Sequence, residues 1–229
     1  MKDYNKLARD ILNLNKMDND FFDIKMDFRT ANKISNDFYK TFFMYERNKE
    51  LDEYEKNISY DFNSGIKPFE GISRLGTYRS YIDISNKESI KRVPVLIHEK
   101  AHVYEKLNHK SKNEFIPTFF ELLCALKLNN DLSKTVLNYK IGEAYKAANI
   151  YLKTKDSNAL SYILDFYRCI NLLEIYINDS KSVIKSLDEN FFMDKDSNQI
   201  IDEFYLDDGK DSINKKIDII AGMSRKVCK

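Results

Sequence analysis

The sequence predicts a mainly α-helical protein with a small β-sheet, an α+β fold class. Glycine and proline number only 6 and 3 among 229 residues, and these residue types interrupt helices and form most tight turns. Apolar residues recur every three to four positions along most of the chain, which is typical of amphipathic helices. One run, at 77–84, is instead rich in β-branched and aromatic residues and predicts a strand.

The length suits one domain, residues 1–229. We expect N-terminal helices over 1–66, an edge strand followed by two helices over 67–130, and further helices over 131–229. Lys plus Arg is 37 and Asp plus Glu is 36, a balance that argues against nucleic acid as a partner. No apolar run is long enough to span a membrane and the N-terminus has no signal-peptide core, so we expect a cytoplasmic location and no membrane partner.

The N-terminal region is expected to form two or three helices, which end before the break at Asn63–Gly65. Two sets of apolar residues recur there at helical spacing: Leu7, Ile11 and Leu14, and Phe38, Phe42 and Tyr45. The strand follows at Thr77–Ile84, and Ser85 to Ser89 offer caps for the next helix.

That next helix, Val93–Leu107, contains His98-Glu99-Lys100-Ala101-His102, an H-E-x-x-H match that includes two of the three histidines in the chain. Side chains four residues apart lie on one face of a helix, so His98 and His102 are able to bind one zinc ion. Glu99 projects beside them as a general base. The third histidine, His109, is expected in an exposed polar turn.

Catalytic zinc needs a third protein ligand, and the following helix offers Glu114 and Glu121 on one face, about 10 Å apart by helical rise. Only one of them can readily bind the same ion. The competing interpretations are a capping-box glutamate for Glu114, within Ser111–Glu114, and a solvated helix face for Glu121.

These segments resemble the M3 oligopeptidases, particularly the oligoendopeptidase F branch. GISRLGTYRSYIDIS and VPVLIHEKAH are similar to that family's glycine-containing segment, strand and zinc helix, and NEFIPTFFELL is similar to its glutamate helix. The resemblance implies a zincin-like (gluzincin) metallopeptidase catalytic domain with one zinc ion per chain. It implies that Glu114 is the third ligand, that Glu121 supports the site, and that Tyr162 faces the substrate carbonyl.

The sequence also departs from that family. The chain is much shorter than members of the family, Ala101 replaces a glycine, and no histidine follows His109 to polarise the substrate. Stabilisation of the transition state would then depend on zinc and on tyrosines such as Tyr162.

We therefore predict a zinc-dependent peptidase that hydrolyses oligopeptides or extended segments, with an extended peptide aligned on the free edge of the strand. The residues assigned to substrate binding are Tyr78, Arg79, Ser80 and Tyr81. An ordinary sheet strand is the alternative for this run. Three other functions stay open: a regulatory metalloprotease with one protein target, a non-catalytic module that binds zinc or peptide, and a helical scaffold without metal.

Overall fold

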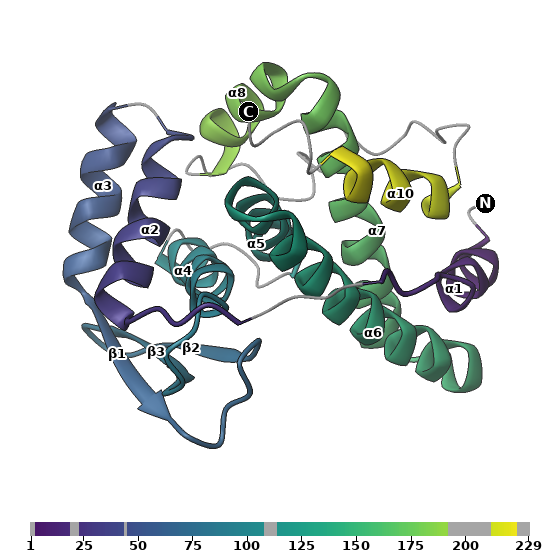
Figure 1. The fold of residues 1–229 in the computed structure, drawn as a ribbon, viewed down its shortest axis with the longest axis horizontal. Coiled ribbons are helices and arrows are strands. Elements are labelled where there is room, and N and C mark those ends of the chain that lie inside the picture. The colour runs from purple at the N-terminus through teal and green to yellow at the C-terminus, as the bar shows by residue number, and fades with distance from the viewer. Residues whose placement is uncertain (1–2, 19–22, 44, 108–113, 192–211, 224–229) are drawn as a thin grey trace. The chain divides into compact units, whose positions relative to one another are not determined.

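The structure is a computed structural model that describes residues 3–18, 23–43, 45–107, 114–191 and 212–223 (Figure 1). The chain forms two compact units. We call residues 22–112 and 179–203 the motif unit, and residues 1–21, 113–178 and 204–229 the helical unit. The described residues are mainly helical with one three-stranded mixed sheet, which confirms the α+β class.

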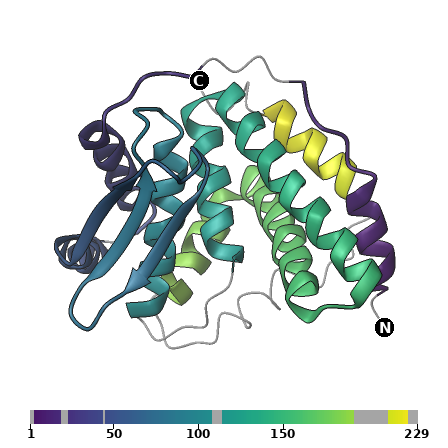
Figure 2. The ribbon, with the colours of Figure 1, turned by 90° about the horizontal axis from the view of Figure 1, so that it is seen from below.

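The motif unit contains the sheet and four of the described helices, of which α4 packs on the sheet. Its elements are α2 (Phe28–Lys40), α3 (Tyr45–Lys56), β1 (Ile58–Asn63), β2 (Gly71–Leu75), β3 (Ser80–Ser85), α4 (Arg92–Leu107) and α8 (Ser180–Phe191). The sheet has the order β1-β3-β2, with β1 parallel and β2 antiparallel to β3 (Figure 2).

The central position of β3 corrects the prediction of an edge strand. Ser80 pairs with Ile58 of β1 on one side and with Leu75 of β2 on the other. The pairing with β1 continues along β3 to Ser85, and the pairing with β2 continues to Ile84. The strand itself was predicted correctly, with its start within three residues of the observed one. The apolar Ile82 and Ile84 that indicated it are fully buried in the structure. Its neighbours were missed because β1 and β2 each bury only one residue and mix polar with apolar residues, so neither stands out in the sequence.

Helix α4 lies against β2 and β3 on one side and against α2 on another. Ser89 sets its start: the Ser89 carbonyl accepts a hydrogen bond from Arg92 N at 3.1 Å, and its Oγ accepts one from Lys91 N at 3.1 Å. Pro94 falls in the first turn, where a missing backbone N–H costs little. Burial of Leu96 and Ile97 then holds the helix in the core of the unit.

The helical unit contains α1 (Tyr4–Leu12), α5 (Phe115–Leu128), α6 (Asn130–Thr154), α7 (Ser157–Asn178) and α10 (Ile213–Met223). Helix α5 packs on α6 and α7, with α1 against α6 and α10 against α7 (Figure 1). Asn129 separates α5 from α6, and its Oδ1 accepts from the N–H groups of Asp131 and Leu132, which caps α6. Lys155 ends α6 in the left-handed region, with φ of 57°.

The predicted helical segments mostly match this arrangement, with shifted ends. The first predicted spacing includes Leu14, two residues beyond the end of α1, and the second continues past the end of α2 at Lys40. The last predicted helix reaches Val227, beyond the described residues. Among the described residues, no helix is both long enough and apolar enough to cross a membrane.

Candidate metal centre

His98 and His102 direct the same ring nitrogen toward each other from successive turns of α4. Their Nε2 atoms lie 3.2 Å apart, and both side chains are buried. The rings are nearly perpendicular, at 76°, with centroids 4.8 Å apart. The four-residue spacing of the motif therefore brings the two nitrogens to one point on the helix face, as predicted from the sequence.

This separation fits two ligands of one tetrahedral zinc ion. Zn–N bonds of about 2.0–2.1 Å at tetrahedral angles place two nitrogen ligands about 3.3 Å apart. The same distance also allows one imidazole to donate a hydrogen bond to the other, depending on the tautomer. The donor set suits zinc in either case, because neutral imidazole is a preferred zinc ligand.

Glu105 was not singled out in the sequence, yet it lies next to the second histidine. Its Oε2 is 3.6 Å from His102 Nδ1, and both side chains are buried. Metal-binding histidines commonly direct their second nitrogen toward a carboxylate, which fixes the ring and its tautomer. The available signal was the three-residue spacing after His102, which places Glu105 one turn further along α4.

Glu99 is buried beside the histidine pair, where the motif unit brings α4 against β2. A Cβ atom at Gly71 of β2 would lie 2.7 Å from Glu99 Cγ and 2.9 Å from Glu99 Oε1. The backbone of β2 therefore packs directly against this carboxylate, and a side chain at position 71 would force Glu99 to move. Gly71 is one of only 6 glycines in the chain, but nothing in the sequence indicates this contact.

Glu114 is the N-cap residue of α5 in the helical unit, and its side chain is half-buried. Helix α5 begins at Phe115, so Glu114 does not occupy the third helical position that a capping-box glutamate requires. The N–H of Glu114 donates to Asp165 Oδ2 of α7 at 3.2 Å. Burial raises the pKa of Asp165, although this hydrogen bond and Arg168 oppose the effect. Because Glu114 and the histidines belong to different units, its assignment as a ligand stays a prediction.

Glu121 is buried rather than on a solvated face, and it forms an ion pair inside the helical unit. Its Oε2 lies 2.9 Å from Lys140 Nζ of α6, which is itself buried. Burial would lower the pKa of Lys140, but Glu121 and Glu143 outweigh it and raise that pKa overall. This pairing occupies Glu121 with a cation of the protein, which favours Glu114 over Glu121 as a metal ligand.

Tyr162 is half-buried on α7, and its hydroxyl donates to Glu143 Oε2 at 2.9 Å. Burial and the adjacent Glu143 carboxylate raise the pKa of Tyr162, so the phenol stays protonated at neutral pH. Glu143 also lies 3.9 Å from Lys140 Nζ. Tyr162 thus belongs to a polar chain in the helical unit, and a role toward substrate stays a prediction.

The residues predicted to bind substrate do not form a free strand edge. Tyr78 and Arg79 are exposed and precede β3, whereas Ser80 and Tyr81 pair with both neighbouring strands. In the described sheet, the strand edge nearest Glu99 belongs to β2, which carries Gly71. His109 lies outside the described residues.

Comparison of the chain with protein-family models, with curated proteins and with solved structures gives no match.

Proposed function

We propose that this chain is a zinc-dependent peptidase of the gluzincin type, with a zincin-like catalytic fold and the cytoplasm as its place of action. The observation that carries the proposal is the 3.2 Å separation of His98 Nε2 and His102 Nε2 on one buried helix face. That separation is the one that two nitrogen ligands of tetrahedral zinc require.

The proposed ligands are His98, His102 and Glu114, with one zinc ion per chain. The two histidines meet on α4, and Glu114 is proposed as the third ligand from the resemblance of NEFIPTFFELL to the glutamate helix of the M3 oligopeptidases. Two histidines and one carboxylate are a frequent ligand set of catalytic zinc, which leaves a fourth position open. The Glu105 carboxylate lies near Nδ1 of His102 and would fix the orientation of that ring, whose Nε2 faces His98.

Zinc bound there would supply an electrophile that acidifies water and polarises a peptide carbonyl. Glu99 would accept the proton of the attacking water and pass it to the leaving amine, since it follows His98 directly and is held in place by β2. Glu121 would support the site through the electrostatics of its ion pair with Lys140. Tyr162 would donate a hydrogen bond to the carbonyl oxygen after release from Glu143, and would stay protonated.

A peptide substrate would pair with β2 rather than with β3. Both edges of β3 are occupied, whereas β2 is an edge strand of the described sheet and Gly71 places it against Glu99. An extended peptide that adds to such an edge is held by main-chain hydrogen bonds, which suits a peptidase that accepts varied sequences.

The test combines metal analysis with cleavage of a mixed peptide library, followed by mass spectrometry. We expect about one zinc ion per chain, and a Glu99→Gln variant that keeps zinc but loses turnover by about 10²–10⁴-fold. Glu53→Gln is the matched control, because Glu53 is an exposed helix glutamate on α3 paired with Lys56. Cleavage retained by Glu99→Gln, or wild type that binds no added zinc, would overturn the proposal. Cleavage of one protein and of no library peptide would assign the same chemistry to a single-target protease.

A further inference from the structure

The face of α4 opposite the histidines carries a fully buried lysine. Successive residues of a helix are rotated by about 100°, so Lys100 points about 160° away from both His98 and His102. Lys100 has no exposed surface, although it is a charged residue in the middle of the motif. Residues of this type are almost never fully buried unless paired, so its surroundings require an explanation.

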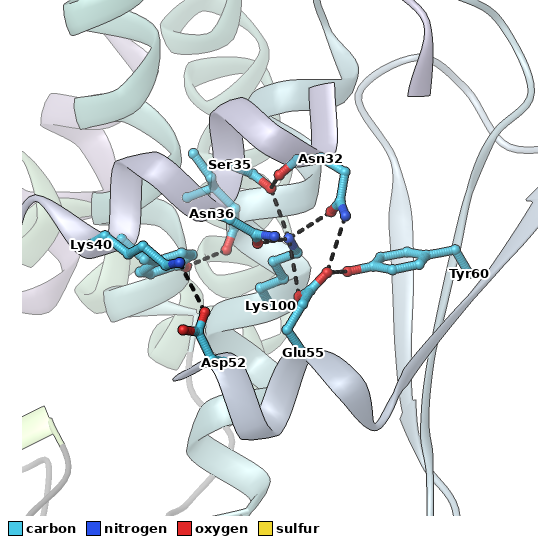
Figure 3. Close-up of polar contacts among 10 residues, drawn as sticks. Asn32, Ser35, Asn36, Lys40, Asp52, Glu55, Tyr60 and Lys100 are labelled. Atoms are coloured by element: carbon cyan, nitrogen blue, oxygen red, sulfur yellow. Dashed lines mark hydrogen bonds and ion pairs between the residues drawn. The ribbon is translucent and has the colours of Figure 1, made fainter. Parts of the chain in front are cut away.

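Four oxygen atoms from α2 and α3 surround the Lys100 ammonium group (Figure 3). Lys100 Nζ donates to Asn32 Oδ1 at 2.7 Å, to Ser35 Oγ at 2.8 Å and also to Asn36 Oδ1. The fourth oxygen, Glu55 Oε2, lies 3.3 Å away and supplies the countercharge. We call Asn32, Ser35, Asn36 and Glu55 the lysine cage.

The cage is itself held in place by further hydrogen bonds. Glu55 Oε1 accepts from the Tyr60 hydroxyl of β1 at 2.6 Å and from Asn32 Nδ2 at 3.1 Å (Figure 3). Tyr39 of α2 adds a second link to α4, because its hydroxyl donates to the Ile97 carbonyl at 2.5 Å. Two helices and a strand therefore converge on one turn of α4.

Stability alone does not explain this arrangement. An apolar side chain at a buried ionic position is often neutral or stabilising, because removing an ammonium and a carboxylate from water is costly. A cage of directional acceptors instead allows one rotation and one axial position of the helix, whereas an apolar contact tolerates small shifts. Such shifts would leave the distance between the two histidines of α4 unchanged, but they would move both histidines and Glu99 together relative to β2 and to any ligand outside α4.

We propose that Lys100 is a positioning residue for the metal centre, acting through the lysine cage to fix the orientation of α4 and hence of His98, Glu99 and His102. This inference rests on the proposed function. Lys100 touches neither substrate nor metal, because it is buried on the far side of the helix. Its effect should therefore appear in the geometry and affinity of metal binding.

The test is a Co²⁺ titration of the purified chain, with Co²⁺ replacing zinc as a probe whose visible spectrum reports ligand geometry. We expect Lys100→Met to remain folded by circular dichroism, to show an altered Co²⁺ spectrum and to bind Co²⁺ about 10–100-fold more weakly. Lys216→Met is the matched control, since Lys216 is also buried and ion-paired, with Glu174 at 2.7 Å in the helical unit. It should change neither the spectrum nor the affinity.

An unchanged spectrum and affinity in folded Lys100→Met would overturn the inference while leaving the proposed function intact. If that variant does not fold, Ser35→Ala decides, because it removes one acceptor of the cage and keeps the lysine. A weaker and spectrally altered Co²⁺ complex of Ser35→Ala supports the inference, and a wild-type-like complex overturns it. A wild-type chain that binds no Co²⁺ and no zinc would overturn both proposals.

Discussion

Gly71 of β2 and Glu99 of α4 are in such close contact that no methyl group fits between them unless a side chain moves. A Cβ atom at Gly71 would lie 2.7 Å from Glu99 Cγ and 2.9 Å from Val95 Cγ1, distances that neither side chain tolerates without moving. Strand β2, which carries Gly71, thus restricts the position of Glu99, the proposed general base.

Gly71→Ala is expected to push Glu99 aside and to lower peptide turnover by about 10–100-fold, because misplacement of a catalytic group by about 1 Å has effects of this size. The crowding should also cost about 1–3 kcal/mol in the free energy of unfolding. Steady-state cleavage and zinc content are the measurements, and zinc content should stay at the wild-type value.

The control for this substitution is Gly142→Ala in α6, where a Cβ atom meets nothing within 4 Å. Alanine in a helix interior is more favourable than glycine by roughly 0.5–1 kcal/mol, so this variant should be slightly more stable with unchanged turnover. Equal turnover of Gly71→Ala and wild type would refute the positioning of Glu99 by β2.

The two candidate carboxylates of α5 can be separated by metal content. Glu114→Gln should lose bound zinc, whereas Glu121→Gln should keep it because Glu121 is paired with Lys140 at 2.9 Å. Inductively coupled plasma mass spectrometry of the purified variants is the measurement. Zinc lost from Glu121→Gln and kept by Glu114→Gln would reverse the assignment of the third ligand.

Lys140→Met should destabilise the chain by about 3–5 kcal/mol, because it removes the buried ammonium that compensates the Glu121 carboxylate. The double variant Lys140→Met/Glu121→Gln should recover most of that loss, which urea unfolding at pH 7 will measure. A single variant as stable as wild type would contradict the ion pair.

The pH dependence of the same pair follows from the raised pKa of Lys140, whose ordinary value is 10.5. A raised folded-state pKa gives stability that is fully present below the unfolded value and is lost as pH rises through the folded value. The stability difference between wild type and Lys140→Met should therefore be constant around pH 7 and shrink only above pH 10.5.

Asp23 offers a test at acid pH. Burial would raise its pKa, but hydrogen bonds from Lys87 and Ser89, with the charge of Lys91, lower it from the ordinary 3.8. A lowered folded-state pKa gives stability that is present above pH 3.8 and is lost as pH falls through the folded value. Asp23→Asn should cost roughly 1 kcal/mol at pH 7.

Unfolding by urea at several pH values between 7 and 2 measures this dependence. The difference in stability between wild type and Asp23→Asn should vanish at the acid end of the series. A difference that persists there would show that Asp23 acts through contacts other than its charge.

Local sequence patterns predicted much of the fold. The scarcity of glycine and proline indicated a mainly helical chain, and the histidine spacing placed two ring nitrogens on one face of α4 because that relation depends only on helical geometry. The burial and ion pairing of Glu121 were harder to predict, since its partner Lys140 is nineteen residues away in another helix. The environment of Lys100 was missed for the same reason, because its cage comes from residues 32–55.

The strand order shows this limit most clearly. The apolar and aromatic residues of β3 predict a strand. Whether that strand lies at the edge or in the centre of the sheet depends on its pairing with β1 and β2. Strand pairing is a long-range contact that leaves little trace in either partner's own sequence.

By itself, the sequence determined the α+β class, the H-E-x-x-H motif and the facing histidines, because periodicity and i to i+4 spacing act within one element. Only the tertiary structure decided that β2 rather than β3 borders Glu99, that Glu121 is neutralised by Lys140, and that Lys100 is enclosed by four oxygens. These outcomes depend on which distant segments share a core, and that is set by the packing of the whole unit.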